Sequence, residues 1–269
     1  MAQGYPRDGR RIPARTLSPS DGDSEKERHL DQETYVLVHG AWHGAWCWRP
    51  VERLLEAAGA RVFTPTLTGL GDRAHLLTPD VGLDTHIADV RAAIETEELR
   101  DVVLVGHSYA GMVVTGVAAE IPDRIKRLVI IDGFLPEAGE AAIRLLPEHA
   151  AAHYLESAEA NDGLVIDPRP VANLGVTDQQ VIDELTPRLT PQPAKTYMDS
   201  IGRGLGELPF TGDYLLCSGW RTPFARFADR AASAGWNVTE LDADHEVLVT
   251  NPELLAQHLL QSGATASAD

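Results

Sequence analysis

One segment constrains the fold of this chain more than any other, and it runs from Asp101 to Gly111. It reads Asp-Val-Val-Leu-Val-Gly-His-Ser-Tyr-Ala-Gly, with Ser108 near its end. The apolar, β-branched run Val102–Val105 has no polar alternation, which is typical of a strand buried on both faces. Small residues flank the serine, and we expect them to permit a sharp turn into a helix at about Ala110–Glu120. The pattern Gly-x-Ser-x-Ala predicts a nucleophile elbow, in which a strained serine exposes its hydroxyl.

Short apolar runs alternate with helical periodicity along most of the chain. Strands are expected near Tyr35–Val38, Arg61–Thr64, Val102–Val105, Arg127–Ile131, Tyr214–Cys217 and Val238–Leu241. Helices are expected near Pro50–Ala58, Leu83–Glu95, Ala110–Glu120, Phe224–Ala234 and Pro252–Leu260. Such alternation predicts the α/β class, with about six mostly parallel strands flanked by helices.

The interval 134–206 interrupts this alternation, since it has no comparable strand and reads as helical or irregular. We expect an inserted helical cap, or lid, over the carboxyl ends of the strands, where open α/β sheets bind ligands. The α/β core would then comprise residues 33–133 and 207–261. Residues 1–32 and 262–269 are poor in aromatic and branched side chains, so we expect a flexible N-terminal extension and a flexible tail.

The composition disfavours several function classes. A formal net charge of -17 would repel nucleic acid and anionic membranes. No apolar stretch reaches the ~18 residues of a membrane span, and the N-terminus lacks the apolar core of a signal peptide. Cys47 and Cys217 cannot build a disulfide framework, and no Cys and His spacing resembles a zinc site. We therefore expect no metal site and a reducing, cytoplasmic setting.

Two further segments carry chemistry. The sequence His-Gly-Ala-Trp-His-Gly-Ala-Trp begins at His39, directly after the first strand, and its backbone amides can turn toward the elbow. We assign an oxyanion-hole donor to the amide of Ala41 and a second one to the amide of Tyr109; a plain tight turn is the alternative. His245 lies in a loop after the last strand, from which a general base can reach the serine hydroxyl.

Five motifs occur in a fixed order: His39–Trp46, Thr66–Arg73, Gly106–Gly111, Ile131–Pro136 and Asp244–His245. Together they resemble the α/β-hydrolase superfamily, and more narrowly its branch of hydroxynitrile lyases, plant methylesterases and bacterial relatives. The resemblance covers roughly residues 34 to 260. It implies cleavage of small esters without a cofactor, with Ser108 as nucleophile, His245 as base, and the two amides named above as the oxyanion hole.

Two positions depart from that branch. In members of that branch, the acidic residue of the catalytic triad usually follows the fifth strand of this core. In this chain the corresponding segment, from Tyr214 to Phe224, has no carboxylate. Asp132, at the end of the preceding strand, is the natural substitute, because a carboxylate there could orient the histidine. The alternatives are that Asp132 only caps a turn and that Ser108 and His245 act as a dyad. In hydroxynitrile lyases a lysine follows the histidine, where this chain has Glu246, which disfavours cyanohydrin cleavage.

Aromatic side chains near the expected cleft and cap indicate an apolar or aromatic ligand. The residues expected to bind the substrate are Trp42, His43, Phe134, Tyr154 and Trp220. The sequence therefore predicts a serine hydrolase that cleaves a small hydrophobic or aromatic ester, thioester or lactone through an acyl-serine intermediate. One alternative is a non-hydrolytic enzyme of secondary metabolism, such as a carbon-carbon bond-forming or bond-cleaving enzyme, a cyclase or a lyase. A second is a non-catalytic small-molecule receptor. The expected partner is a small molecule, and the chain could be a monomer or a homodimer.

Overall fold

The computed structural model describes residues 32–264, and these residues form one six-stranded sheet with the order β2-β1-β3-β4-β7-β8. Its strands are β1 (Thr34–Val38), β2 (Arg61–Phe63), β3 (Val102–His107), β4 (Ile125–Ile131), β7 (Asp213–Cys217) and β8 (Asn237–Leu241). Every neighbouring pair is parallel. The expected α/β class and sheet are therefore confirmed, whereas the expected extension and tail lie almost entirely outside the described residues.

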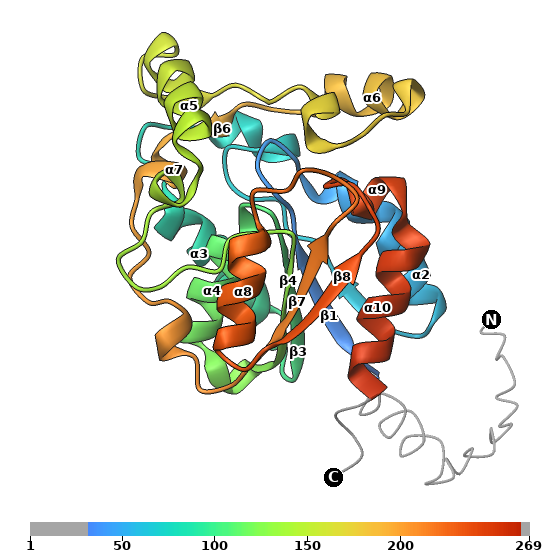
Figure 1. Cartoon of the computed structure of the whole chain (residues 1–269). Coiled ribbons are helices and arrows are strands. Elements are labelled where there is room, and N and C mark those ends of the chain that lie inside the picture. Colours follow the sequence, from blue (N-terminus) through green and yellow to red (C-terminus); the bar gives the residue numbers. More distant parts are fainter. Residues whose placement is uncertain (1–31, 265–269) are drawn as a thin grey trace, which may run out of the picture. The chain divides into compact units, whose positions relative to one another are not determined.

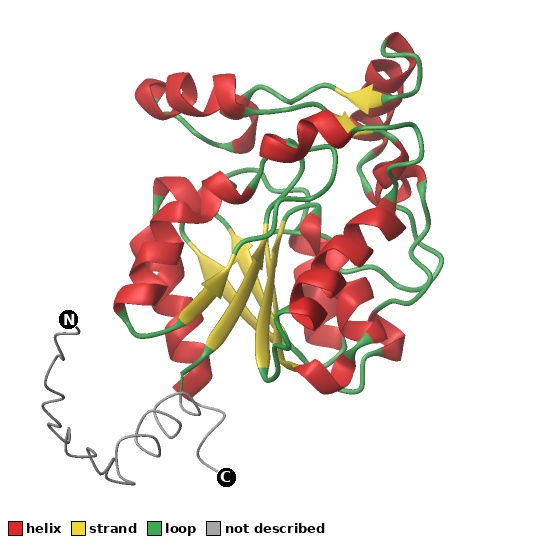
Figure 2. Cartoon of the chain, turned by 180° about the vertical axis from the view of Figure 1, so that it is seen from behind, coloured by secondary structure: helices red, strands yellow, loops and turns green. Residues whose placement is uncertain are grey.

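Helices cover both faces of the sheet (Figures 1 and 2). One face carries α2 (Arg49–Ala57), α9 (Val247–Thr250) and α10 (Pro252–Ala264), and the other carries α3 (Leu83–Thr96), α4 (Ala110–Glu120) and α8 (Ala225–Ser233). The side chains of a strand alternate between the two cores, as strand geometry requires. Val36 and Val38 pack with α3 and α4, whereas Tyr35 and Leu37 pack with α2 and α10. Double-sided burial explains why these strands are continuous apolar runs.

Between β4 and β7 the chain leaves the sheet. This segment contains α5 (Glu148–Ala160), α6 (Gln179–Leu185), α7 (Lys195–Met198) and a small antiparallel pair, β5 (Val165–Ile166) with β6 (Gln192–Pro193). The sequence did not predict that two-residue pair. Figure 1 shows α5, β6 and α6 beyond one end of the sheet. The segment is tied to the carboxyl edge by contacts to the loop after β1 and to the loop after β8.

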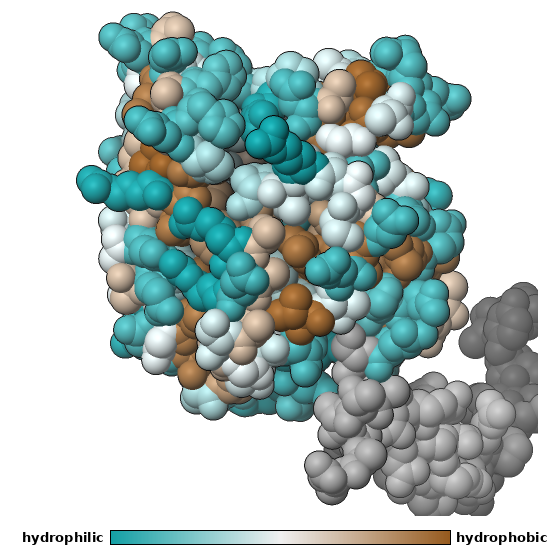
Figure 3. Space-filling view, viewed as in Figure 1, coloured by the Kyte–Doolittle hydropathy of each residue, from teal (hydrophilic) through white to brown (hydrophobic). Residues whose placement is uncertain are grey.

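The register of the sheet brings the loops that carry the chemistry together. Val38 of β1 pairs with Gly106 of β3, and His107 pairs with Ile131 of β4, which pairs in turn with Leu215 of β7. The loops after these strands therefore begin at one edge. Hydrophilic residues cover much of the face seen in Figure 3. Within residues 32–264, no helix combines the length and apolar character needed to cross a bilayer.

Candidate active site

Ser108 lies in a tight turn between β3 and α4. Its φ angle is 57°, in the left-handed region that residues other than glycine rarely adopt. The Ser108 amide donates to the Ile131 carbonyl at 3.0 Å. The Ser108 carbonyl accepts hydrogen bonds from the amides of Gly111 and Phe134. These bonds on both sides of the serine hold the strained geometry of a nucleophile elbow.

Two glycines let this turn pack against the end of β4. A Cβ atom at Gly133 would lie 2.5 Å from the Ser108 carbonyl oxygen, and one at Gly111 would collide with the Phe134 carbonyl oxygen. A larger residue at either position would push the two loops apart. The small residue after the elbow therefore serves the approach of β4 as well as the turn itself.

His245 connects Ser108 to Asp132. Its Nε2 lies 3.0 Å from the Ser108 Oγ, and its Nδ1 lies 2.7 Å from the Asp132 Oδ2. Asp132 is fully buried and, like the serine, has a positive φ, here 39°. A carboxylate at Nδ1 favours the tautomer whose Nε2 can accept the serine proton. The structure thus brings the three residues expected to be catalytic into one hydrogen-bonded chain.

The segment after β7 supplies hydrogen-bond donors to this carboxylate. The Trp220 Nε1 donates to the Asp132 Oδ2 at 3.0 Å, and the Thr222 Oγ1 donates to the Oδ1 at 2.9 Å. With His245, the buried carboxylate has three partners, as a buried charge requires. Sequence reasoning placed Trp220 at the substrate and did not single out Thr222. Because the segment after β7 has no carboxylate, its polar side chains could have been considered as hydrogen-bond donors to a carboxylate on a neighbouring strand.

His245 is held by its backbone and by its ring. Its amide donates to the Leu174 carbonyl at 3.0 Å, and its carbonyl accepts from the His107 Nε2 at 2.8 Å. Burial lowers the pKa of His107 well below its usual value, so this ring is neutral and acts as a plain donor. The His245 ring stacks on Phe224, with centroids 5.5 Å apart and planes 9° from parallel. These contacts leave the ring little freedom to rotate away from Ser108.

The two expected oxyanion-hole amides lie at the end of β1 and at the start of α4. In the part of the chain that the structure describes, neither the Ala41 amide nor the Tyr109 amide donates a hydrogen bond. The ring of His39 holds the first loop, because its Nε2 accepts from the Leu67 amide at 3.0 Å and its Nδ1 donates to the Gly40 carbonyl at 2.8 Å. Burial lowers the pKa of His39 to about 3, which keeps that ring neutral.

A cavity of about 10 Å³ lies beside Ser108, with space for about one water molecule. Its lining comprises Gly40, Ala41, Trp42, His43, His107, Ser108, Leu174, His245 and Glu246. Leu174 comes from the segment between β4 and β7, so that segment closes the cavity. Ala41 therefore faces the same space as the serine, whereas Tyr109 is not part of the lining.

The residues expected to bind the substrate fall into two groups. Trp42 and His43 line the cavity, whereas Phe134, Tyr154 and Trp220 do not. Phe134 is 1% exposed and packs among other rings, and Tyr154 meets Trp42 edge-on with centroids 5.7 Å apart. Tyr154 therefore packs behind Trp42, whereas Phe134 packs with Phe224 and Phe227, and Trp220 lies against His245.

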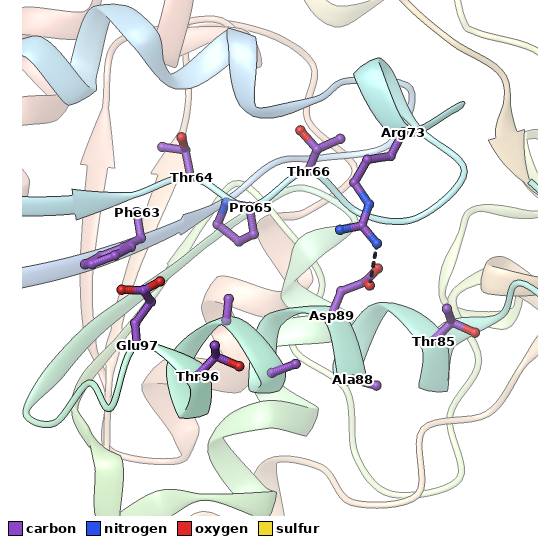
Figure 4. Close-up of a pocket in the computed structure, with 12 residues that line it drawn as sticks. Phe63, Thr64, Pro65, Thr66, Arg73, Thr85, Ala88, Asp89, Thr96 and Glu97 are labelled. Atoms are coloured by element: carbon purple, nitrogen blue, oxygen red, sulfur yellow. Dashed lines mark hydrogen bonds and ion pairs between the residues drawn. The ribbon is translucent and has the colours of Figure 1, made fainter. Parts of the chain in front are cut away.

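A larger groove lies away from the serine, between the segment after β2 and the helix α3 (Figure 4). Its volume is about 740 Å³, and its walls include Phe63, Ala92 and an ion pair of Arg73 with Asp89 at 3.1 Å. It shares no lining residue with the cavity at Ser108. Within residues 32–264, no cluster of His, Cys, Asp and Glu side chains could hold a metal ion.

Comparisons with known proteins agree with this geometry. The alpha/beta hydrolase family matches residues 35–258. The chain is 42% identical to a carbendazim hydrolyzing esterase of Nocardioides sp. (strain SG-4G), over 85% of this chain and 99% of that protein. It is 26% identical to methylesterase 8 of Arabidopsis thaliana, over 87% and 91% of the two chains. Among solved structures, an extracellular alpha/beta-hydrolase from a Paenibacillus species is similar in fold, with a TM-score of 0.77 at 23% identity over 85% and 98% of the chains.

Proposed function

Because this chain belongs to the alpha/beta hydrolase family and is an enzyme, we propose that it hydrolyses a small hydrophobic or aromatic ester, thioester or lactone through an acyl-serine intermediate. One observation carries the proposal: a continuous contact chain from the Ser108 Oγ through both nitrogens of His245 to the Asp132 carboxylate. This is the geometry that activates a serine hydroxyl for attack on a carbonyl carbon.

In the first half of the reaction, the Ser108 Oγ attacks the carbonyl carbon while the His245 Nε2 takes the hydroxyl proton. The amides of Ala41 and Tyr109 stabilise the negative oxygen that forms. Asp132 stabilises the imidazolium. The protonated ring then gives its proton to the leaving oxygen or sulfur, and an acyl-serine remains. In the second half, a water molecule gives a proton to the same nitrogen and attacks the acyl carbon. The ring then returns this proton to the Ser108 Oγ as the acid is released.

The relatives support an ester as the substrate class, since the protein that is 42% identical is named an esterase. The contact of Asp132 with His245 favours hydrolysis over non-hydrolytic chemistry, because the motive for that alternative was a missing acid. The indole of Trp42, which lines the cavity and packs against Tyr154, favours a flat or apolar acyl group or alcohol. Cys47 and Cys217 are buried free thiols, which fits a reducing, cytoplasmic setting.

The cavity beside the serine is too small for an ester, since it holds about one water molecule. We therefore infer that the 3-10 helix Val171–Leu174 moves when substrate binds. The moving part would include the bond between the Leu174 carbonyl and the His245 amide.

A fluorophosphonate probe and a short activated ester test this proposal. We expect the wild type to be labelled at Ser108 and to hydrolyse the ester, whereas Ser108→Ala loses labelling and about 10^6-fold in kcat, as other serine hydrolases do. His245→Ala should also fail to label. Ester turnover near the wild-type rate in Ser108→Ala would place the chemistry elsewhere, and an unchanged thermal unfolding midpoint would show that the variant is folded.

A further inference from the structure

A second histidine and a second carboxylate lie buried beside the proposed catalytic residues. The His43 Nε2 is 3.2 Å from the Glu246 Oε2, and both side chains are less than 5% exposed. Glu246 directly follows His245, and His43 is two residues after Ala41. Both side chains line the cavity at Ser108. The pair therefore joins the loop of the base to the loop of the oxyanion hole.

The protonation of His43 follows from the groups around its ring. Its Nδ1 lies 2.7 Å from the Ala41 carbonyl oxygen, which can only accept, so this nitrogen carries a proton. Its Nε2 faces a carboxylate, which also only accepts when ionised. Both nitrogens therefore bear protons, and the ring is an imidazolium. The contact to Glu246 is not aligned as a hydrogen bond, so it acts mainly through charge.

The charges around the pair agree with this assignment. Burial by itself lowers the pKa of His43, but the Glu246 carboxylate outweighs burial, and the pKa is raised above its usual value. Burial likewise raises the pKa of Glu246, but His43 outweighs it and brings the pKa to about 2. The other charged or titratable groups that act on the pair are Arg188, His39, His107, His245, Asp244, Cys47 and Cys217. Arg188 lies over the Trp46 ring and opposes the charge on His43.

Stability alone does not account for such a pair. Taking two charges out of water is costly, and an apolar replacement of a buried pair is often as stable or more so. The Glu246 oxygens and the His43 Nε2 also lack hydrogen-bond partners within residues 32–264. A costly pair that lines the reaction cavity points to a role in the reaction.

The backbone of the oxyanion-hole loop shows what the pair can do. Trp42, between Ala41 and His43, has a φ of 66°, a strained value for a tryptophan. Its amide donates to the Gln192 Oε1 at 3.2 Å, and its carbonyl accepts from the Thr190 amide at 2.8 Å. Those two bonds come from the segment between β4 and β7. On the core side, His43 holds the carbonyl of the Ala41–Trp42 peptide, whereas His39 holds the Gly40 carbonyl, which belongs to the same peptide as the Ala41 amide.

We propose that the His43–Glu246 ion pair positions the oxyanion hole: Glu246 keeps His43 doubly protonated, so that its ring holds the Ala41 carbonyl and keeps positive charge beside the cavity at Ser108. This inference rests on the proposed function. Both side chains are positioning residues, because they act on the Ala41–Trp42 peptide, which directly follows the Ala41 amide, rather than on the substrate. The favourable effect on a developing oxyanion is electrostatic and preorganised.

The test compares Glu246→Gln, His43→Gln and the double variant with Glu240→Gln, a control at an exposed position on β8. The amide of E246Q can donate to a neutral His43, which keeps the packing and removes the charge. In E246Q we expect kcat to fall about 10- to 100-fold, with KM within twofold of the wild type. This loss is smaller than the ~10^2- to 10^3-fold loss of kcat that follows removal of an oxyanion-hole donor. E240Q should match the wild type.

The pH dependence of kcat distinguishes a positioning role of the His43–Glu246 pair from a role in packing alone. In E246Q the buried ring loses its counter-charge, so its pKa falls and it loses its proton as pH rises. A descending limb in kcat should therefore appear at lower pH in E246Q than in the wild type. The double variant removes both charges and should recover the unfolding midpoint but not kcat. Recovery of kcat in the double variant would mean that the pair only packs, and the proposal would be wrong.

Two further measurements keep this test separate from the proposed function. Imidazole nitrogen NMR, assigned with H43Q, should show His43 doubly protonated at pH 6 in the wild type and a lower pKa for this ring in E246Q. The rate of fluorophosphonate labelling at Ser108 should fall in E246Q even if no tested ester is hydrolysed. A neutral wild-type His43, or equal labelling rates, would overturn the inference, whereas absence of ester turnover with slower labelling would count only against the ester as substrate.

Discussion

The ends of β4 and β7 lie side by side and differ in what they supply to His245. Ile131 at the end of β4 pairs with Leu215 of β7. The turn after β4 provides the carboxylate of Asp132, whereas the longer loop after β7 provides two donors to that carboxylate, Trp220 and Thr222. At this edge the turn after β4 holds the carboxylate, and the loop after β7 supplies hydrogen bonds that stabilise its charge.

The backbone shows the same division between the two strands. The Asp132 amide donates to the Leu215 carbonyl at 2.7 Å. The Tyr214 hydroxyl of β7 donates to the Gly133 carbonyl at 2.6 Å and lies 3.2 Å from the Gly133 amide, which donates to it. The turn with a φ of 39° at Asp132 is therefore held by β7. Neither strand end would place the carboxylate without the other.

The largest effect in this comparison should come from the carboxylate itself. Asp132→Asn should lower kcat for an ester by about 10^3 to 10^4, because an amide can hold the wrong histidine tautomer and cannot stabilise imidazolium. Steady-state kinetics on a short activated ester measures this. A loss of less than tenfold would mean that Ser108 and His245 act as a dyad and that the β4 end has only a structural role.

A smaller effect should follow from the indole donor. Trp220→Phe keeps a ring against His245, whose centroid lies 5.0 Å away, and removes the hydrogen bond to the Oδ2. We expect kcat to fall about tenfold, since a hydrogen bond to a charged group contributes ~1.5 to 3 kcal/mol and other donors remain. In an Asp132→Asn background the same change should have little further effect. If the losses in kcat from the two substitutions were additive, the indole of Trp220 would act independently of the Asp132 carboxylate.

The smallest effect should come from the hydroxyl donor. Thr222→Val keeps the shape of the side chain and removes a bond to the Oδ1, the oxygen that does not contact His245. We expect a two- to fivefold fall in kcat, about 1 kcal/mol or less. The same hydroxyl also accepts from the Phe224 amide, so a urea titration should accompany the kinetics. A larger loss than in Trp220→Phe would reverse the ranking of the two donors.

Much of the site could be predicted because it depends on short segments. The elbow at Ser108 needs a buried strand, small residues and a helix within eleven positions, and all of these are visible in the order of residues. The glycine after Asp132 and the loop of His245 follow strands that hydrophobic pattern alone locates. The role of Trp220 could not be predicted, because its indole reaches a carboxylate 88 positions away.

The sequence by itself determined the order of strands and helices and the residue types at the strand ends, because hydrophobic period and turn residues act over a few positions. Only the tertiary structure shows that Asp132 contacts His245, since the two residues lie 113 positions apart in the sequence. The tertiary structure also buries the rings of Phe134 and Tyr154, and it leaves a cavity of about 10 Å³ beside Ser108. Such contacts depend on sheet register and on close packing between distant segments, which local pattern does not encode.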